Sequence, residues 1–200
     1  MNLLLFETQK GDAFPIGERD SDGNQEVRKN SGRIGQLKKI IHETYRKLFN
    51  KLPYHERLCT QLRNSSELRV MHSPGVDPSE AHRRLDHFMK LSISKHTLWT
   101  WINGIVAIPG IFLTPIPGPN VFFFYPAARS LGHYLARKGA RRTLMLDTIH
   151  FQEEPLIDEV QNDLKMDPEK VSAALSELEQ RYNLFDLDKL LKRLNKDERE

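Results

Sequence analysis

The dominant pattern along the chain is a recurrence of apolar residues every three to four positions, which predicts amphipathic helices. One such stretch runs from Arg33 to about Pro53 with a basic opposite face, and residues 54–71 predict one or two shorter helices. Asp77-Pro78 combines a capping side chain with proline at the first helical position, and Glu80 completes a reciprocal cap, so a longer helix should begin there.

Similar signals predict helices near the carboxyl end of the chain. Asp167-Pro168 precedes an apolar repeat that reaches Tyr182, and a further helix is expected from about Asp186. Residues 151–200 therefore predict a C-terminal helical hairpin.

The first six residues, Met-Asn-Leu-Leu-Leu-Phe, form an apolar run that predicts a short strand. Turn residues at Gly11-Asp12 and Pro15-Ile16-Gly17 suggest a small hairpin, and the polar residues that follow suggest a linker. Because Glu7 interrupts the run and further acidic residues follow, we expect neither a cleavable secretion signal nor a mitochondrial presequence.

These elements predict a mainly α protein: a helical domain with a short N-terminal β element and a central Pro/Gly-rich hydrophobic hairpin. We expect an N-terminal strand and linker over residues 1–32, a helical core over 33–150, and the C-terminal helical hairpin over 151–200. The hydrophobic hairpin itself occupies residues 97–128.

This hairpin is unusual because no Asp, Glu, Lys or Arg occurs between Lys95 and Arg129, in a chain that is 28% charged. The length is typical of a membrane-inserted segment, and Trp99 and Trp101 stand where an interfacial aromatic belt would place them. Prolines prevent one continuous helix. The bend, and a candidate functional motif, is the group Pro115, Pro117, Gly118, Pro119 and Asn120.

Three arrangements of residues 97–128 remain open: a short single span, a re-entrant hairpin, and a buried hairpin at the core of a helical domain. Residues 98–113 would reach about 24 Å as a helix, less than the hydrocarbon thickness of roughly 30 Å. Both flanks are basic, and basic flanks prefer the same side of a membrane. This favours the re-entrant form.

A polar stripe follows the hairpin, formed by Tyr125, Arg129, His133 and Arg137 at steps of four residues. It could face lipid phosphate or an acidic partner, or serve as an ion relay in which His133 titrates. Alternatively, its arginines pair with acidic residues of the chain such as Glu153 or Asp158 and only stabilise the fold.

Composition and motifs argue against other classes of protein. A net charge of +3 is too small to predict nucleic-acid binding. No phosphate loop, dinucleotide fingerprint, nucleophile elbow or zincin motif occurs, so we expect a non-enzyme without catalytic residues or cofactors. Cys59 with His55 is better explained as a packed thiol, and the spacing of His82, Asp86 and His87 is better explained by surface hydrogen bonds than by a metal.

The text Pro-Gly-Pro-Asn-Val-Phe-Phe-Phe-Tyr-Pro at residues 117–126, then Arg129, His133-Tyr134 and residues 136–140, resembles the mitochondrial potassium–hydrogen exchange-related family. The amino-terminal strand is similar too. The resemblance implies a protein of the mitochondrial inner membrane, or of the inner membrane in bacterial relatives, connected with potassium–proton exchange. It supplies no catalytic residues.

A self-sufficient exchanger normally has several spans and an acidic residue within the membrane, and neither is present here. We therefore expect a membrane-associated component or regulator of the exchange system, in contact with lipids and with a protein partner or further copies of itself. The alternative is a soluble or peripheral helical scaffold that binds a protein or anionic lipid headgroups.

Overall fold

The computed structural model describes residues 1–7, 13–18, 52–112, 121–166 and 171–184. These residues fall into two compact units. The sheet unit draws on Met1–Ser21, Ser65–Met89 and Leu144–Glu200, and the helix unit on Asp22–Asn64 and Lys90–Thr143. The helix predicted between Arg33 and Pro53, the one from Asp186, and the motif Pro115, Pro117, Gly118, Pro119 and Asn120 lie outside the described residues.

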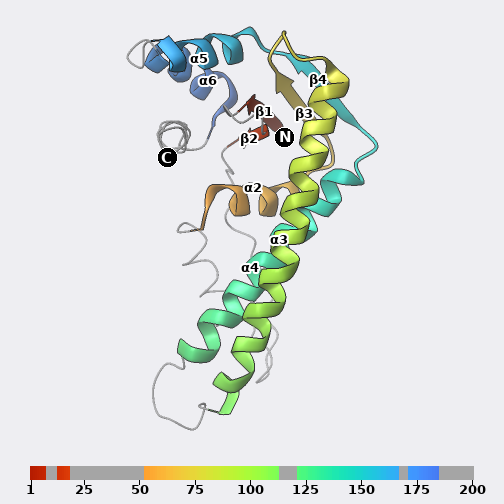
Figure 1. Ribbon diagram of the computed structural model, residues 1–200, viewed down its shortest axis with the longest axis vertical. Helices are drawn as coiled ribbons and strands as arrows, with labels where there is room; N and C mark the ends of the chain where they lie inside the picture. Colours follow the sequence, from red (N-terminus) through yellow and green to blue (C-terminus); the bar gives the residue numbers. More distant parts are fainter. Residues whose placement is uncertain (8–12, 19–51, 113–120, 167–170, 185–200) are drawn as a thin grey trace. The chain divides into compact units, whose positions relative to one another are not determined.

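The sheet unit contains four strands in the order β2-β1-β3-β4 (Figure 1). Their bounds are Asn2–Glu7 for β1, Ala13–Gly17 for β2, Leu68–His72 for β3 and Ile149–Glu153 for β4. Strand β1 pairs antiparallel with β2 and parallel with β3, which pairs parallel with β4. The uninterrupted apolar run of β1 matches its burial, because Leu3, Leu4, Leu5 and Phe6 alternate between the two faces of the sheet and all are buried.

Two sequence expectations need correction here. Residues 68–72, expected to be helical, form strand β3, because the short apolar run lies between β1 and β4 with Leu68 and Val70 fully buried. Pro15-Ile16-Gly17, expected in a turn, belongs to strand β2. Proline is tolerated there because β2 is an edge strand, whose outer amides need no partner in the sheet.

Helices α5 (Pro155–Met166) and α6 (Val171–Tyr182) belong to the same unit and pack on each other. The helix predicted to reach Tyr182 is thus confirmed. Glu154, 5% exposed, accepts hydrogen bonds from Arg181 (3.2 Å) and from the Tyr182 hydroxyl, which fastens the start of α5 to the end of α6.

Helix α3 (Pro78–Phe112) contributes its first turns to the sheet unit and its remainder to the helix unit. Asp77 caps it as predicted, accepting a hydrogen bond from the Ser79 amide at 2.8 Å. Glu80 does not complete a reciprocal cap, because its carboxylate is held by Arg83 at 2.7 Å and by Arg84 at 2.6 Å.

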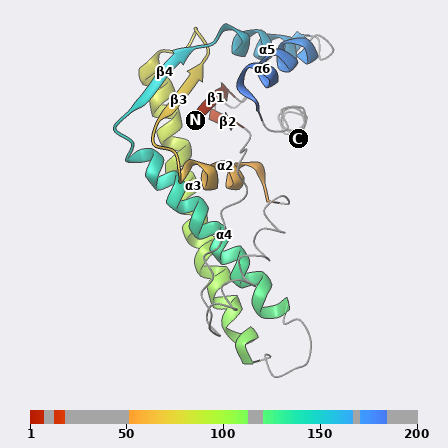
Figure 2. The ribbon, with the colours of Figure 1, turned by 180° about the vertical axis from the view of Figure 1, so that it is seen from behind.

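The helix unit consists, in its described part, of α2 (Tyr54–Leu62), the later part of α3, and α4 (Val121–Leu144). Helices α3 and α4 run side by side (Figures 1 and 2). Small residues permit this closeness: a Cβ on Gly110 would lie 2.8 Å from the Phe122 backbone, and Ser130 donates a hydrogen bond to the Thr100 carbonyl at 3.0 Å. A Cβ on Gly139 would lie 1.6 Å from the Cys59 carbonyl oxygen, so α2 meets α4 backbone to backbone.

The mainly helical fold with an N-terminal strand element is therefore confirmed, and the sequence missed the two further strands. Within the described ranges, no helix combines the length and the apolarity that a membrane crossing requires. The single-span and re-entrant forms of residues 97–128 are accordingly not confirmed.

Candidate functional site

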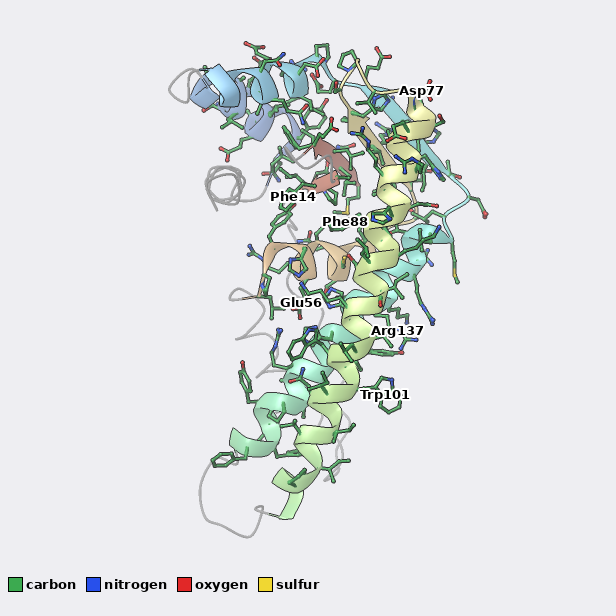
Figure 3. The ribbon with its side chains drawn as sticks, viewed as in Figure 1. Phe14, Glu56, Asp77, Phe88, Trp101 and Arg137 are labelled. Carbon is green, nitrogen blue, oxygen red and sulfur yellow. The ribbon has the colours of Figure 1, made fainter. Side chains whose placement is uncertain are left out.

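The helix unit holds a cluster of buried and partly buried polar side chains, which we call the polar cluster: Glu56 of α2, His96 of α3, and Arg129, whose side chain is 18% exposed, with His133 of α4. Glu56 and His96 are each 1% exposed and His133 is 5% exposed. Three helices that are adjacent only in the folded chain thus supply one site, and Figure 3 shows Glu56 beside the α3–α4 pair. Buried polar groups of this kind must satisfy one another, because water cannot reach them.

Arg129 organises the cluster. Its guanidinium donates to both carboxylate oxygens of Glu56, at 3.1 and 3.2 Å, and to Nε2 of His133 at 3.1 Å. Two parallel bonds of this kind hold an arginine and a carboxylate in a fixed orientation.

The hydrogen-bond directions follow from Arg129, since a guanidinium can only donate. His133 Nε2 must therefore accept, which places the proton of the neutral ring on Nδ1. That Nδ1 lies 3.0 Å from Nδ1 of His96, so His133 donates and His96 accepts. The remaining proton of His96 then sits on Nε2, a buried atom without a hydrogen-bond partner among the described residues.

The electrostatics of the cluster keep both histidines neutral. Burial lowers the pKa of His96 to about 3, with His133 adding to the effect. Burial and then the Arg129 charge lower the pKa of His133 to about 4. Burial also raises the pKa of Glu56, and the Arg129 guanidinium opposes this shift. Protonating either ring would also set two donors against each other along the chain of hydrogen bonds that begins at Arg129.

The surroundings of the cluster are aromatic and basic. Trp99 stacks on His133 with ring centroids 6.2 Å apart, and His55 lies 6.0 Å from His96. The Lys95 ammonium lies 3.5 Å from Nε2 of His55. Arg129 and Lys95 together therefore outweigh the single negative charge of Glu56.

The four residues of the predicted stripe on α4 do not share one environment in this structure. Arg129 and His133 enter the polar cluster, whereas Tyr125 is 49% exposed and Arg137 is half-buried one turn beyond His133. The partner suggested for Arg129 was wrong: Glu56 binds it, and the Asp158 carboxylate instead accepts a hydrogen bond from Ser73.

Sequence reasoning missed Glu56 and His96. Glu56 is one of many acidic residues on a short helix, and His96 stood out only as a basic flank of the uncharged segment. A local signal existed only for Arg129 and His133, which are four residues apart on one helix. Glu56 and His96 are 40 residues apart, a separation that no helical spacing connects.

The two sites considered and set aside in the sequence lie elsewhere. His82 and His87 are exposed on α3, and His82 packs edge-on against Phe151 at 5.6 Å. Cys59 is fully buried, and burial raises the pKa of its thiol to about 12. It is a packed thiol, as the sequence suggested.

Residues 22–150 match the family model described as mitochondrial K+-H+ exchange-related. The chain belongs to this family. The matched range includes all four members of the polar cluster and the whole uncharged segment. Neither a curated protein nor a solved structure matches the chain.

Proposed function

We propose that the protein is a membrane-associated, non-enzymatic component or regulator of potassium–proton exchange, located in the mitochondrial inner membrane or in the inner membrane of a bacterium. Membership of the exchange-related family supports the connection with this process. The observation that carries membrane association is an exposed surface of large apolar side chains on the α3–α4 pair.

We call this surface the apolar face; its members are Leu98, Trp99, Trp101, Ile102, Ile105, Val106 and Ile108 of α3 and Phe122 of α4. Trp101 is 67% exposed, Ile105 62% and Phe122 74%. Figure 3 shows Trp101 projecting away from α4. Contiguous exposed apolar surface of this kind marks a site that contacts lipid or protein.

Polar side chains of the same segment bond back to their own helix. Thr97 donates to the Ile93 carbonyl at 2.6 Å, Thr100 to the His96 carbonyl at 2.6 Å, and Asn103 to the Trp99 carbonyl at 2.8 Å. Internal bonding of this type satisfies the hydroxyl donors of Thr97 and Thr100 and one amide donor of Asn103 without water. It favours a lipid neighbour over an aqueous one.

Partial insertion fits these features better than a crossing. The apolar face would enter the lipid from one side, with the basic residues that flank it, including exposed Arg141 and Arg142, at the anionic surface. This corresponds to the re-entrant arrangement.

Vesicle flotation of the full chain tests membrane association. The protein should float with vesicles of phosphatidylcholine and an anionic phospholipid and remain bound after a high-salt wash. Trp101→Ser combined with Ile105→Ser should weaken binding about tenfold or more, because each buried side chain of this size contributes roughly 1.5–3 kcal/mol. The matched control is Met145→Ser, which removes a side chain that is 77% exposed outside the apolar face.

Ion-flux measurements test the connection with exchange. Membranes from cells that lack the protein should recover slowly from an imposed proton gradient in the presence of potassium. The wild-type protein and the ionophore nigericin should each restore the rate, and the Trp101→Ser, Ile105→Ser variant should not. Normal exchange in the deletion strain would refute the proposal, and binding that salt removes would point instead to a peripheral scaffold.

A further inference from the structure

We propose that Glu56, His96 and His133 form a binding site for a divalent transition-metal ion of the zinc class. The site would take one ligand from each of α2, α3 and α4. Its ligands are not members of the apolar face, although Trp99 of that face stacks on His133, and metal binding here does not depend on the proposed role in exchange.

The distances suit one ion. The three residues each present a ligand atom, and these atoms all lie within 4.8 Å of one another. The two Nδ1 atoms are 3.0 Å apart, and His133 Nδ1 is 3.7 Å from Glu56 Oε1. Tetrahedral zinc with bonds of about 2.0–2.1 Å separates its ligands by roughly 3.4 Å. The two separations that involve His133 differ from this value by a few tenths of an ångström, and the third ligand pair, which lies within 4.8 Å, would close further as the ion binds.

The donor set selects the type of metal. Two imidazoles and one carboxylate suit zinc and its neighbours among the transition metals, whereas magnesium and calcium prefer oxygen ligands alone. Three protein ligands leave a fourth position for water or another group.

His96 also has a second ring nitrogen that the protein leaves unpaired among the described residues. Its ring is 1% exposed, yet Nε2 has no hydrogen-bond partner among the described residues. A buried unpaired ring nitrogen is costly. Rotation of the ring by half a turn about its Cβ–Cγ bond places Nε2 where Cε1 now lies and Nδ1 where Cδ2 now lies, so the two nitrogens of His96 can take new directions without backbone movement.

Arg129 is the competitor of the metal. A metal on Nδ1 of His133 moves the ring proton to Nε2, where it would face the Arg129 donor now 3.1 Å away. No net proton is released, but Arg129 must withdraw to Oε2 of Glu56. The positive charge of Arg129 also repels the ion. Occupancy of the site therefore depends on the balance between this guanidinium and the metal concentration.

Calorimetric titration of the full chain with zinc chloride, at constant ionic strength, tests the site. One ion per chain should bind, and magnesium chloride should not compete. His133→Ala and His96→Ala should each weaken binding about 100-fold or more, and Glu56→Gln about tenfold. Cobalt chloride should produce the visible absorption of a tetrahedral complex. It should also quench the fluorescence of Trp99, because this side chain stacks on His133.

Arg129→Gln gives the sharpest test, because it should tighten zinc binding about tenfold or more. The substitution removes the competing charge and offers an amide oxygen to the Nε2 proton of His133. Misfolding cannot produce such a gain, so this variant keeps the test valid even if a histidine variant fails to fold.

The matched control is His87→Ala, which removes an exposed histidine from α3 outside the cluster. The zinc affinity of this variant should equal that of the wild-type protein. Loss of binding in His87→Ala, unchanged binding in both His96→Ala and His133→Ala, or weaker binding in Arg129→Gln would each overturn the proposal.

Discussion

In the sheet unit, Leu3, Leu4 and Phe6 are at most 1% exposed, whereas in the helix unit Trp101 and Ile105 are more than 60% exposed. The interior of the helix unit combines buried apolar residues such as Leu58 and Leu62 with charged and titratable groups, since Glu56 and His96 are each 1% exposed. The sheet unit follows the usual hydrophobic arrangement, in which burial of apolar surface stabilises the fold. The helix unit departs from it by burying polar groups while large apolar side chains stay exposed, an arrangement that suits an apolar neighbour outside.

The two interiors also differ in the substitutions that they tolerate. A core of leucines loses stability in proportion to the volume removed, because the cavity does not fully collapse. A buried polar network instead depends on complete pairing, because one missing partner leaves the others unsatisfied. The two units should therefore respond to different kinds of substitution.

The largest effect is expected at the contact between α2 and α4. Gly139→Ala should destabilise the helix unit by more than about 4 kcal/mol, since the new Cβ would lie 1.6 Å from the Cys59 carbonyl oxygen, a backbone atom. Urea denaturation monitored by hydrogen exchange measures the loss in each unit. Gly104→Ala is the matched control, because its Cβ would meet only the Ser130 hydroxyl at 3.6 Å. Equal stability of the two variants would contradict this packing.

A pair of apolar truncations compares the two units directly. Leu4→Ala, in a side chain that is 0% exposed, should cost about 3 kcal/mol. Ile105→Ala, at 62% exposure, should change the free energy of unfolding by less than about 0.5 kcal/mol without lipid and weaken vesicle binding. A loss above about 2 kcal/mol for Ile105→Ala in lipid-free protein would show that protein already covers the apolar face.

The histidine pair makes the stability of the helix unit depend on pH. The pKa values of His96 and His133 in the folded protein, about 3 and 4, lie below the ordinary value of 6.5. As the pH falls below 6.5, the unfolded chain therefore binds more protons than the folded chain, and the fold loses stability. Stability is fully present above pH 6.5 and should decline by roughly 2 kcal/mol between pH 6.5 and 5.5, and further below that.

Urea titrations at several pH values, with a chelator present, measure this decline. His133→Gln is the matched variant, because an amide can accept from Arg129 and donate to His96 but does not titrate. Its stability should fall less steeply over the same range. An identical slope in both proteins would assign the decline to other groups.

The smallest effect concerns a reaction that leaves the fold unchanged. Burial raises the pKa of Cys59 to about 12, so the thiolate that alkylating reagents attack is scarce at neutral pH. Iodoacetamide should label native protein far more slowly than protein in urea, as mass spectrometry can show. Rapid labelling of the native chain would mean that α2 opens from α4.

Local chemistry explains which parts of the fold could be predicted. The capping group of Asp77 and the apolar run of the first strand act on neighbouring residues, so their spacing in the chain is sufficient. Strand β3 was missed because it is only five residues long, and its residues follow neither a clear helical period nor a clear alternation. The small hairpin or edge element predicted around Pro15 does form, with Pro15 opposite Leu5 in β1, but its residues extend the edge strand itself instead of a turn.

The candidate site follows the same division. The step of four residues placed Arg129 and His133 together, but no spacing links them to Glu56, 73 residues from Arg129. Acidic residues are frequent in this chain, and the sequence suggested the wrong ones. Only the approach of α2 to α4 at Gly139 identifies Glu56 as the partner.

The sequence by itself determined the start of α3, the helix that reaches Tyr182, the buried first strand, the uncharged segment and the family of this protein, because each depends on residue types at short separations. Tertiary structure alone decided that Glu56, His96, Arg129 and His133 meet, and that the apolar side chains of α3 face outward. Pairing between distant groups depends on which helices pack and how closely, and that is a property of the whole fold.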